Sequence, residues 1–503
     1  MDLSDLIDRN AAFMPEKAAL RFGDASWSYA AFAERIVTAA RALKSELGVG
    51  RGDRIAVLSL NRPEHLVLLY ACSRLGAMLV PLNWRLAVPE QLYILENASV
   101  KALFLEEAFA AVIGLARQAL PQIRVIGLDF APVDGAGLAE LLEAGRGDGR
   151  NPHIDFACPL LIVYTSGTTG RPKGAVLRQE ALHWNAVNSV HMHELTAQDH
   201  VLTVLPLFHV GGLNIQTTPA LQFGATVTLH PRFDPAATLG AIVRERPTLT
   251  VLVPATIQAL IGLPGWPAAD VSSLRAVTTG STIVPQALID AVTARGVPVL
   301  QVYGSTETSP ICIYTRNGAS PVNSTGLPGL VSEARIVDDR GRELPPGAPG
   351  EIVIRGPTVL FEYWGDEAAT AEVLRNGWYH SGDIGSRDTA GFFYVHERKR
   401  NVIVSGGENV YPAEIERVLA EHPDVLDAAV IGRPHPKWQE VPVAFVVRRS
   451  DTLSAEALFV HLRVHLARFK LPHEIRFVPE LPRNALGKVQ HFRLREALAA
   501  GAG

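Results

Sequence analysis

Ten residues at 165–174 carry the densest set of phosphate-binding groups in the sequence. They read TSGTTGRPKG and follow the apolar run 160–164, which is typical of a strand. Glycines let backbone N–H groups approach an anion, hydroxyls add donors, and a lysine adds positive charge. The candidate phosphate ligands are therefore Thr165, Ser166, Gly167, Thr168, Thr169, Gly170 and Lys173.

Two other interpretations fit this glycine-rich stretch less well. A surface turn can have the same composition, but a strand that runs directly into so many donors is unusual for a turn. A Walker P-loop ends in Gly-Lys-Ser/Thr, whereas Lys173 follows Pro172 and precedes Gly174. The spacing therefore disfavours a kinase or a GTPase.

The stretch 303–308, Tyr-Gly-Ser-Thr-Glu-Thr, follows a candidate strand, where open parallel sheets bind their ligands. Tyr303 can lie on a purine, and Thr306 can donate to a phosphate. Glu307 can hold Mg²⁺ through oxygen, and its alternative role is a carboxylate that caps a helix. The adjoining residues of this turn, also candidates for nucleotide binding, are Gly304 and Ser305.

Weaker candidates are spread over the rest of the chain. His209 follows a candidate strand, although a lone histidine beside apolar residues is as often a core residue. Asp383 lies in a tight turn, where it can accept both hydroxyls of a ribose. The other positions singled out are Gly280 and Ser281 after a strand, Arg398 in a charge run, Gly406 and Gly407 in a short turn, and Lys488 near the chain end.

Alternating helical and strand-like patterns must position these residues. Strands are expected at 54–60, 78–82, 101–105 and 123–128, and again at 200–205, 226–229, 249–253, 276–279 and 299–303. Helices are expected at 30–46, 64–75 and 89–97. This βαβ pattern predicts an α/β protein with two layered α/β subdomains. Short β-rich pieces over 326–395 predict a small β-barrel or sheet, and the last 105 or so residues predict a separate α+β domain.

Composition narrows the class of function. The chain has 503 residues, an apolar fraction of 48%, a net charge of −4 and three distant cysteines. The net charge does not indicate a basic surface for nucleic acid. The number and spacing of the cysteines indicate neither a disulfide framework nor a zinc site. The absence of a signal peptide and of an 18-residue apolar run predicts a cytoplasmic chain without a transmembrane segment. The oligomeric state stays open, a homodimer included.

With TSGTTGRPKG, YGSTE, SGD and PRNALGK in this order, the chain resembles the adenylate-forming, acyl-activating superfamily. Through PLFHVGG and SGGENVYPAEIE it is most similar to bacterial fatty-acyl-CoA and aryl-CoA ligases. The resemblance implies an N-terminal adenylation domain over 1–398, with the ATP and acid sites, and a mobile C-terminal domain over 399–503. It implies ATP, Mg²⁺ and coenzyme A as partners of the reaction.

The resemblance also implies a role for each candidate. Lys488 would bridge the substrate carboxylate and the α-phosphate, Thr306 would bind that phosphate, and Glu307 would hold Mg²⁺. The stretch 165–174 would hold the departing phosphates. Adenine would be held by Gly280, Ser281 and Tyr303, the ribose by Asp383 and Arg398, and pantetheine would pass Gly406, Gly407 and His209.

Two departures from the family pattern bear on the moving domain. The hinge position is Arg400 instead of Asp or Lys, and the usual Trp-Gly-Glu reads Trp438-Gln439-Glu440, which puts a close backbone approach there in doubt. Two other functions stay open at this point. One is an enzyme that loads a carrier protein instead of CoA, and the other is a non-catalytic nucleotide-binding relative.

The acid is the least determined partner. The segments that would line its pocket by resemblance, 208–226, 252–262, 278–284 and 303–314, contain no Lys or Arg. A second carboxylate buried there would lack a partner, so dicarboxylates are disfavoured. The expected substrate is a medium-to-long fatty acid or a hydroxylated aryl acid such as a cinnamate. The polar end of such an aryl acid would meet Asn214, Gln216 or Thr308.

Overall fold

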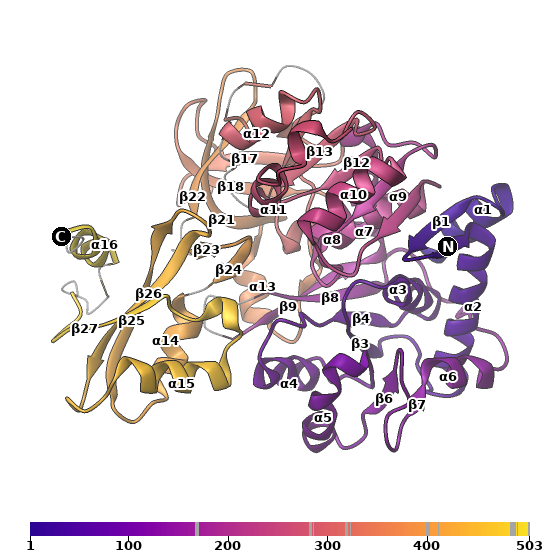
Figure 1. The fold of residues 1–503 in the computed structure, drawn as a ribbon, viewed down its shortest axis with the longest axis horizontal. Helices are drawn as coiled ribbons and strands as arrows, with labels where there is room; N and C mark the ends of the chain where they lie inside the picture. Colours follow the sequence, from indigo (N-terminus) through magenta and orange to yellow (C-terminus); the bar gives the residue numbers. More distant parts are fainter. Residues whose placement is uncertain are drawn as a thin grey trace. The chain divides into compact units, whose positions relative to one another are not determined.

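The computed structural model describes residues 1–165, 171–280, 284, 286–316, 320–321, 323–398, 403–410, 412–482, 489 and 491–500. It has a mixed α/β fold with a large N-terminal part and a smaller C-terminal part (Figure 1), which confirms the predicted fold class. Its contacts define two compact units. Unit 1 comprises 1–84, 95–164 and 174–397, and unit 2 comprises 85–94, 165–173 and 398–503.

The first sheet of unit 1 has eight strands in the order β19-β9-β8-β4-β3-β5-β6-β7. Its central strands are parallel and almost wholly buried, as expected when helices cover both faces of a sheet. The strands β8 and β9 flank the glycine-rich stretch, so this stretch joins two strands of the first sheet. The bounds are β3 Arg54–Leu58, β4 Met78–Pro81, β5 Ala102–Leu105, β6 Arg124–Gly127, β7 Ala136–Gly137, β8 Pro159–Thr165, β9 Lys173–Arg178 and β19 Glu362–Tyr363.

The second sheet has nine strands in the order β16-β15-β14-β13-β12-β10-β11-β1-β2. From β10 the chain adds β11 on one side and β12 on the other, so the strand order reverses at β10. Ligands of open parallel sheets bind outside the carboxyl ends of the strands at such a point. The bounds are β1 Ala18–Phe22, β2 Ala25–Ser28, β10 His200–Thr203, β11 Thr226–Leu229, β12 Leu249–Val251, β13 Ala276–Gly280, β14 Val299–Tyr303, β15 Ile313–Tyr314 and β16 Leu327–Pro328.

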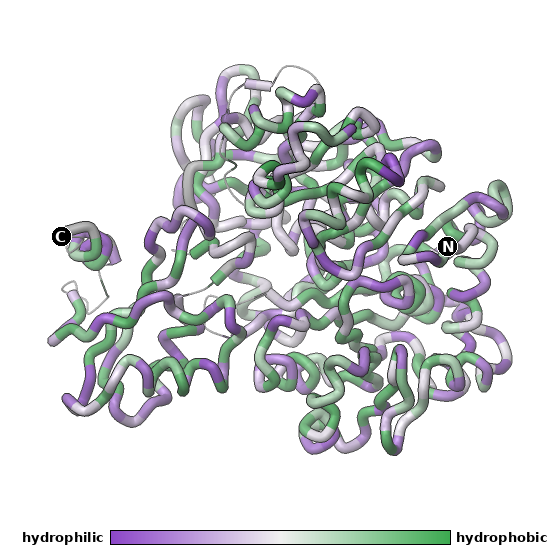
Figure 2. The backbone as a smooth tube through the Cα atoms, viewed as in Figure 1, coloured by the Kyte–Doolittle hydropathy of each residue, from purple (hydrophilic) through white to green (hydrophobic). Residues whose placement is uncertain are grey.

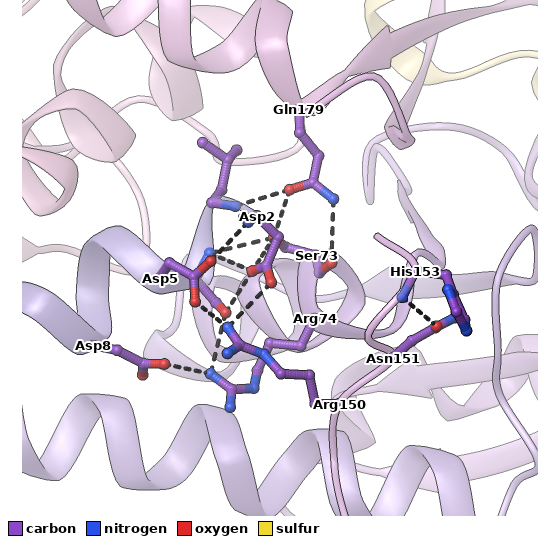
Figure 3. A network of polar contacts seen from close by, with 11 residues as sticks. Asp2, Asp5, Asp8, Ser73, Arg74, Arg150, Asn151, His153 and Gln179 are labelled. Carbon is purple, nitrogen blue, oxygen red and sulfur yellow. Dashed lines mark hydrogen bonds and ion pairs between the residues drawn. The ribbon is translucent and has the colours of Figure 1, made fainter. Parts of the chain in front are cut away.

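The N-terminus is held by buried polar contacts (Figure 3). Asp2 accepts hydrogen bonds from Ser4 and from the Ser73 hydroxyl at 3.1 Å, and Gln179 accepts from the same hydroxyl at 2.8 Å. Arg74 forms an ion pair of 2.7 Å with Asp8. These contacts join α1 (Ser4–Phe13), α3 (Pro63–Leu75) and α7 (Gln179–His193). The next element of the chain after α1, strand β1, pairs with β11 across about 200 residues of sequence.

The predicted β-rich module is a five-stranded antiparallel sheet made of β17, β18, β20, β21 and β22. Its longest strand, β21, contains Asp383, so the predicted tight turn at this residue is wrong. Gly382, with φ +71°, and an irregularity in the pairing of β18 with β21 bend the strand beside it instead. The bounds are β17 Glu333–Val337, β18 Gly350–Arg355, β20 Leu374–Arg375, β21 Trp378–Arg387 and β22 Phe393–Arg398.

Unit 2 is built around the sheet β24-β23-β26-β25, with β27 paired to β26. Its helices α14 and α15 pack apolar side chains against this sheet, among them Ile415, Leu419 and Leu458. Hydrophobic and hydrophilic stretches are interspersed along these elements (Figure 2). The bounds are β23 Ile403–Ser405, β24 Glu408–Val410, β25 Val425–His435, β26 Gln439–Arg448, β27 Glu474–Phe477, α14 Pro412–Ala420, α15 Ala455–His465 and α16 His491–Ala500. No helix in the described part of the chain has the length and apolar character needed to cross a bilayer.

Candidate nucleotide and acid site

Two glycines at the ends of neighbouring strands allow close backbone packing. Gly280 is the last residue of β13 and pairs with Val302 of β14, whose carbonyl oxygen would lie 2.4 Å from a Cβ at position 280. A Cβ at position 304 would lie 1.7 Å from the carbonyl oxygen of Pro310. No side chain fits at either position without a backbone shift. Packing alone therefore requires these glycines, and their contact with a nucleotide stays a prediction.

Tyr303 and Asp383 meet at the carboxyl end of β14. The Tyr303 hydroxyl donates a hydrogen bond of 2.8 Å to Oδ2 of Asp383, which is 9% exposed. The backbone N–H of Asp383 donates to the Ser381 hydroxyl, which itself donates to the carbonyl of Ile352. Burial, and next the charge of Asp383, raise the pKa of Tyr303 well above its ordinary value. The phenol therefore stays protonated and remains a donor.

Thr306 and Glu307 lie in the short 3₁₀ turn Thr306–Thr308 that follows β14, and both are nearly buried. Oε1 of Glu307 accepts a hydrogen bond of 2.7 Å from the hydroxyl of Tyr363. The residue that precedes this turn is Ser305, and its N–H donates to Thr308 at 2.9 Å. The contact with Tyr363 disfavours the helix-capping alternative for Glu307. Sequence reasoning missed Tyr363, because nothing near position 363 indicates that β19 would bring it here.

His209 is exposed, so the alternative of a core histidine is wrong. It precedes the short helix α8 (Val210–Gly212), and its Nδ1 accepts a hydrogen bond of 3.0 Å from the N–H of Gly211. A neutral ring that accepts at Nδ1 carries its proton on Nε2. The next residues form a π-helical turn, η2 (Leu213–Thr217), and then α9 (Thr218–Gln222).

The buried residues of the expected acid-binding segments, called the wall below, are mostly apolar and include a few polar groups. Gln216 and Asn214 of η2 are 1% and 0% exposed. Within the described residues, Oε1 of Gln216 and Nδ2 of Asn214 have no hydrogen-bond partner. Thr308 is fully buried too, and Sγ of Cys312 donates to its hydroxyl at 3.6 Å. The apolar residues named for this wall, all buried, are Val210, Leu213, Ile215, Leu252, Ile257, Ile311 and Ile313.

The predicted hinge residue Arg400 and several predicted ligands lie outside the described residues. These ligands are Ser166, Gly167, Thr168, Thr169, Gly170, Ser281 and Lys488. The side chain of Arg398 is outside them too. At the two ends of the glycine-rich stretch, the hydroxyl of Thr165 donates to the carbonyl of Lys173 at 3.5 Å. The roles of all these residues stay predictions.

In unit 2, Gly406 and Gly407 form the two-residue turn between β23 and β24. Their φ angles are +58° and +85°, as in the hairpin turns that favour glycine at both positions. The turn geometry explains both glycines without a ligand, so their place beside a pantetheine channel stays a prediction. Nearby, Gln439 has φ +68°, a left-handed conformation that glycine adopts without strain.

Comparison with known proteins agrees with this geometry. The family described as AMP-binding enzyme matches residues 7–364, and the AMP-binding enzyme C-terminal domain matches residues 414–488. An indoleacetate–CoA ligase of Aromatoleum aromaticum is 50% identical over 99% of this chain and 98% of its own length. A feruloyl-CoA synthase of an Amycolatopsis species is 39% identical over 97% of both chains.

A solved structure has the same fold. A double mutant of the o-succinylbenzoate CoA synthetase of Bacillus subtilis, bound to a product analogue, superposes with a TM-score of 0.89 at 31% identity. The match covers 99% of both chains. The likeness extends over both sequence-matched regions.

Proposed function

Since the chain belongs to the AMP-binding enzyme family, we propose that its substrate is an aryl monocarboxylic acid. The chain is an acyl-CoA synthetase, as the sequence predicted, with ATP and CoA as its other substrates. The observation that carries the aryl assignment is a pair of buried amides, Asn214 and Gln216, each with an unpartnered polar atom among the described residues of an otherwise apolar wall.

Two features favour an aryl acid over a fatty acid. Burying a polar group without a partner costs free energy, and a plain alkyl chain would leave both amides unpaired. A ring N–H or a hydroxyl supplies a donor for Oε1 of Gln216, and a hydroxyl oxygen can also accept from Nδ2 of Asn214. The relative at 50% identity is named for indoleacetate and the one at 39% for a feruloyl group, both of which are aryl acids with a ring donor. The wall segments lack Lys and Arg, which favours an acid with a single carboxylate.

The chemistry requires two steps. In the first, a carboxylate oxygen of the acid attacks the α-phosphorus of ATP, and the bond to pyrophosphate breaks. Because two anions must meet, positive charge near the α-phosphate is the main requirement. Lys488 would supply it, together with the cation that Glu307 would hold. The hydroxyl of Thr306 would bind the α-phosphate, and the stretch 165–174 would hold the departing phosphates. In the second step the thiolate of CoA attacks the acyl carbonyl, and AMP leaves.

A single described carboxylate fits the proposed magnesium site. Mg²⁺ in nucleotide sites is held by one or two carboxylates together with substrate phosphates and water. Glu307 is such a carboxylate, and its Oε1 is oriented by Tyr363. In the described part of the chain no group of three or more His, Cys, Asp or Glu could hold a metal. Most ligands of the ion would therefore come from ATP, and the ion would neutralise phosphate charge.

The substrate assignment can be tested with the purified protein. Pyrophosphate release would be measured with indole-3-acetate, ferulate, benzoate, a series of fatty acids, malonate and succinate, and the thioesters identified by mass. The expected result is highest kcat/KM for a bicyclic or hydroxylated aryl acid. A fatty acid or a dicarboxylate as the best substrate would overturn the proposal. Loading of a carrier protein without formation of a CoA thioester would favour the alternative acceptor.

A second experiment tests the proposed division of work between residues 1–398 and the mobile part 399–503. Lys488→Ala should reduce acid-dependent ATP–pyrophosphate exchange by about 10²-fold or more, because a charge partner of the transition state is lost. Thioester formation from supplied acyl adenylate should largely survive. Equal losses in both assays would contradict the two-step assignment of Lys488.

A further inference from the structure

Gln216 belongs to a series of three buried side chains that hydrogen bonds connect, and these bonds fix its orientation. His193 is the last residue of α7, Thr278 lies in β13 two residues before its carboxyl end, and Gln216 lies in η2. Nε2 of His193 lies 2.8 Å from the Thr278 hydroxyl, and Nε2 of Gln216 lies 3.1 Å from the same oxygen. All three residues are at most 3% exposed.

The protons in this series of hydrogen bonds can be assigned by starting at His193. Nδ1 of His193 lies 2.8 Å from the carbonyl oxygen of Ser189, which can only accept, so Nδ1 carries a proton. Burial lowers the pKa of His193 to about 4, so the ring is neutral at neutral pH and its Nε2 accepts. The Thr278 hydroxyl therefore donates to His193, and its oxygen accepts from the amide group of Gln216.

This proton order decides which way the Gln216 amide points. The NH₂ group faces Thr278, and the carbonyl oxygen Oε1 is left buried without a partner among the described residues. A buried acceptor without a donor costs free energy unless a ligand supplies one.

The place of Gln216 in the fold also points to a ligand. It lies in a π-helical turn, a rare structure that occurs frequently at functional sites. This turn packs on β10 and β12, where the strand order of the sheet reverses. Open α/β sheets bind their ligands outside the carboxyl ends of the strands at such a reversal.

We propose that Gln216 determines substrate specificity: its Oε1 accepts a hydrogen bond from a ring N–H or O–H of the aryl acid, and Thr278 and His193 position it. The inference rests on the proposed function, because it assumes that an aryl acid occupies this site. Thr278 and His193 act through Gln216 and are positioning residues.

Matched substrate pairs isolate this hydrogen bond. The first pair is indole-3-acetate and 1-benzothiophene-3-acetate, in which sulfur replaces the ring N–H. The second pair is ferulate and 3,4-dimethoxycinnamate, in which a methyl group replaces the phenolic proton. A site built to receive a donor should prefer the donor member of at least one pair by about tenfold to hundredfold in kcat/KM. The pair with the larger ratio identifies which donor is bound.

Four variants then test the assignment. Gln216→Met keeps the volume and removes the acceptor, so the ratio should fall to within about threefold of one, mainly through a higher KM for the donor substrate. Gln222→Met is the control, because Gln222 is another buried glutamine just C-terminal to η2, with its Oε1 paired to His183. Thr278→Val frees the Gln216 amide to rotate and should lower the ratio, whereas Thr278→Ser keeps the hydroxyl and should preserve it.

The outcomes separate this inference from the proposed function. If both members of each pair are activated equally by the wild-type protein, or if Gln216→Met keeps the full ratio, the role of Gln216 is overturned. If Gln216→Met does not fold, the contrast between Thr278→Val and Thr278→Ser decides in the same way. If no aryl acid releases pyrophosphate while a fatty acid does, the proposed function itself fails.

Discussion

The Tyr303 hydroxyl donates a hydrogen bond of 2.8 Å to the carboxylate of Asp383, across a sequence separation of 80 residues. One residue ends a strand of the second α/β sheet, and the other lies in the five-stranded β-sheet module. The contact joins the residue proposed to lie on adenine with the carboxylate proposed to bind the ribose. It therefore provides a direct test of that pair of assignments.

Tyr303→Phe keeps the aromatic ring and removes the donor. A hydrogen bond to a charged group contributes about 1.5–3 kcal/mol, so KM for ATP should rise by about tenfold to hundredfold. KM for the acid should change little, because the acid is bound elsewhere. Steady-state kinetics with each substrate varied in turn check this result, and equal rises in both KM values would contradict the assignment.

Glu307→Gln should weaken the response to Mg²⁺. The amide lacks the charge that attracts the cation, so the Mg²⁺ concentration for half-maximal pyrophosphate release should rise by about tenfold or more. Tyr363→Phe removes the hydrogen bond that orients this carboxylate and should give a smaller rise. Glu362→Gln on the same short strand is the control and should keep the wild-type requirement. An unchanged Mg²⁺ requirement in Glu307→Gln would rule out this carboxylate as a ligand.

Gln439→Gly should stabilise the hairpin of β25 and β26 relative to Gln439→Ala. Both variants lose the glutamine side chain, but only alanine keeps a Cβ in the left-handed conformation at φ +68°. This conformation costs about 1–2 kcal/mol for a residue with a Cβ, and the greater freedom of glycine in the unfolded chain offsets part of it. The urea concentration at the midpoint of unfolding should be higher for the glycine variant than for the alanine variant, although glycine is ordinarily unfavourable in strands. A higher midpoint for alanine would show that position 439 is unstrained.

His65 should make the stability of the chain depend on pH. Burial lowers its pKa to about 4, and its Nε2 has no partner among the described residues. Between pH 4 and about 6.5 the unfolded state binds a proton at His65 that the folded state does not bind. The contribution of His65 to the free energy of unfolding is therefore complete above about pH 6.5 and falls as the pH is lowered. The loss is about 1.4 kcal/mol per pH unit.

His65→Leu should remove this dependence. The free energy of unfolding, measured by urea titration at pH 5.5 and 7.5, should decrease less on acidification than in the wild-type protein. Buried His193 contributes in the same direction, so part of the slope should remain. His153→Leu replaces an exposed histidine and is the control. A slope that matches the wild-type value in His65→Leu would show that the ring is protonated in the folded state.

Local signals in the sequence were enough to predict the fold class and the family, although helices such as α7 and α10 were not predicted. Strands such as β13 and β14 were predicted to within one residue of their observed ends, because short apolar runs bounded by Gly, Pro and polar residues are local signals. The motifs around positions 165–174 and 303–308 predicted an adenylate-forming enzyme, and the family comparison confirmed it. Phosphate chemistry requires glycines, hydroxyls and a lysine close together in the chain, so this signal is local as well.

Which distant side chains meet depends on how the elements pack in three dimensions. No pattern near Tyr363 predicts its contact with Glu307, and none near His193 predicts the chain to Thr278 and Gln216. Sheet order and helix packing bring these residues together over separations of 56 to 85 positions. The same packing decided that His209 is exposed and that β1 pairs with β11. Such contacts depend on burial and pairing between elements far apart in the chain, which local periodicity does not encode.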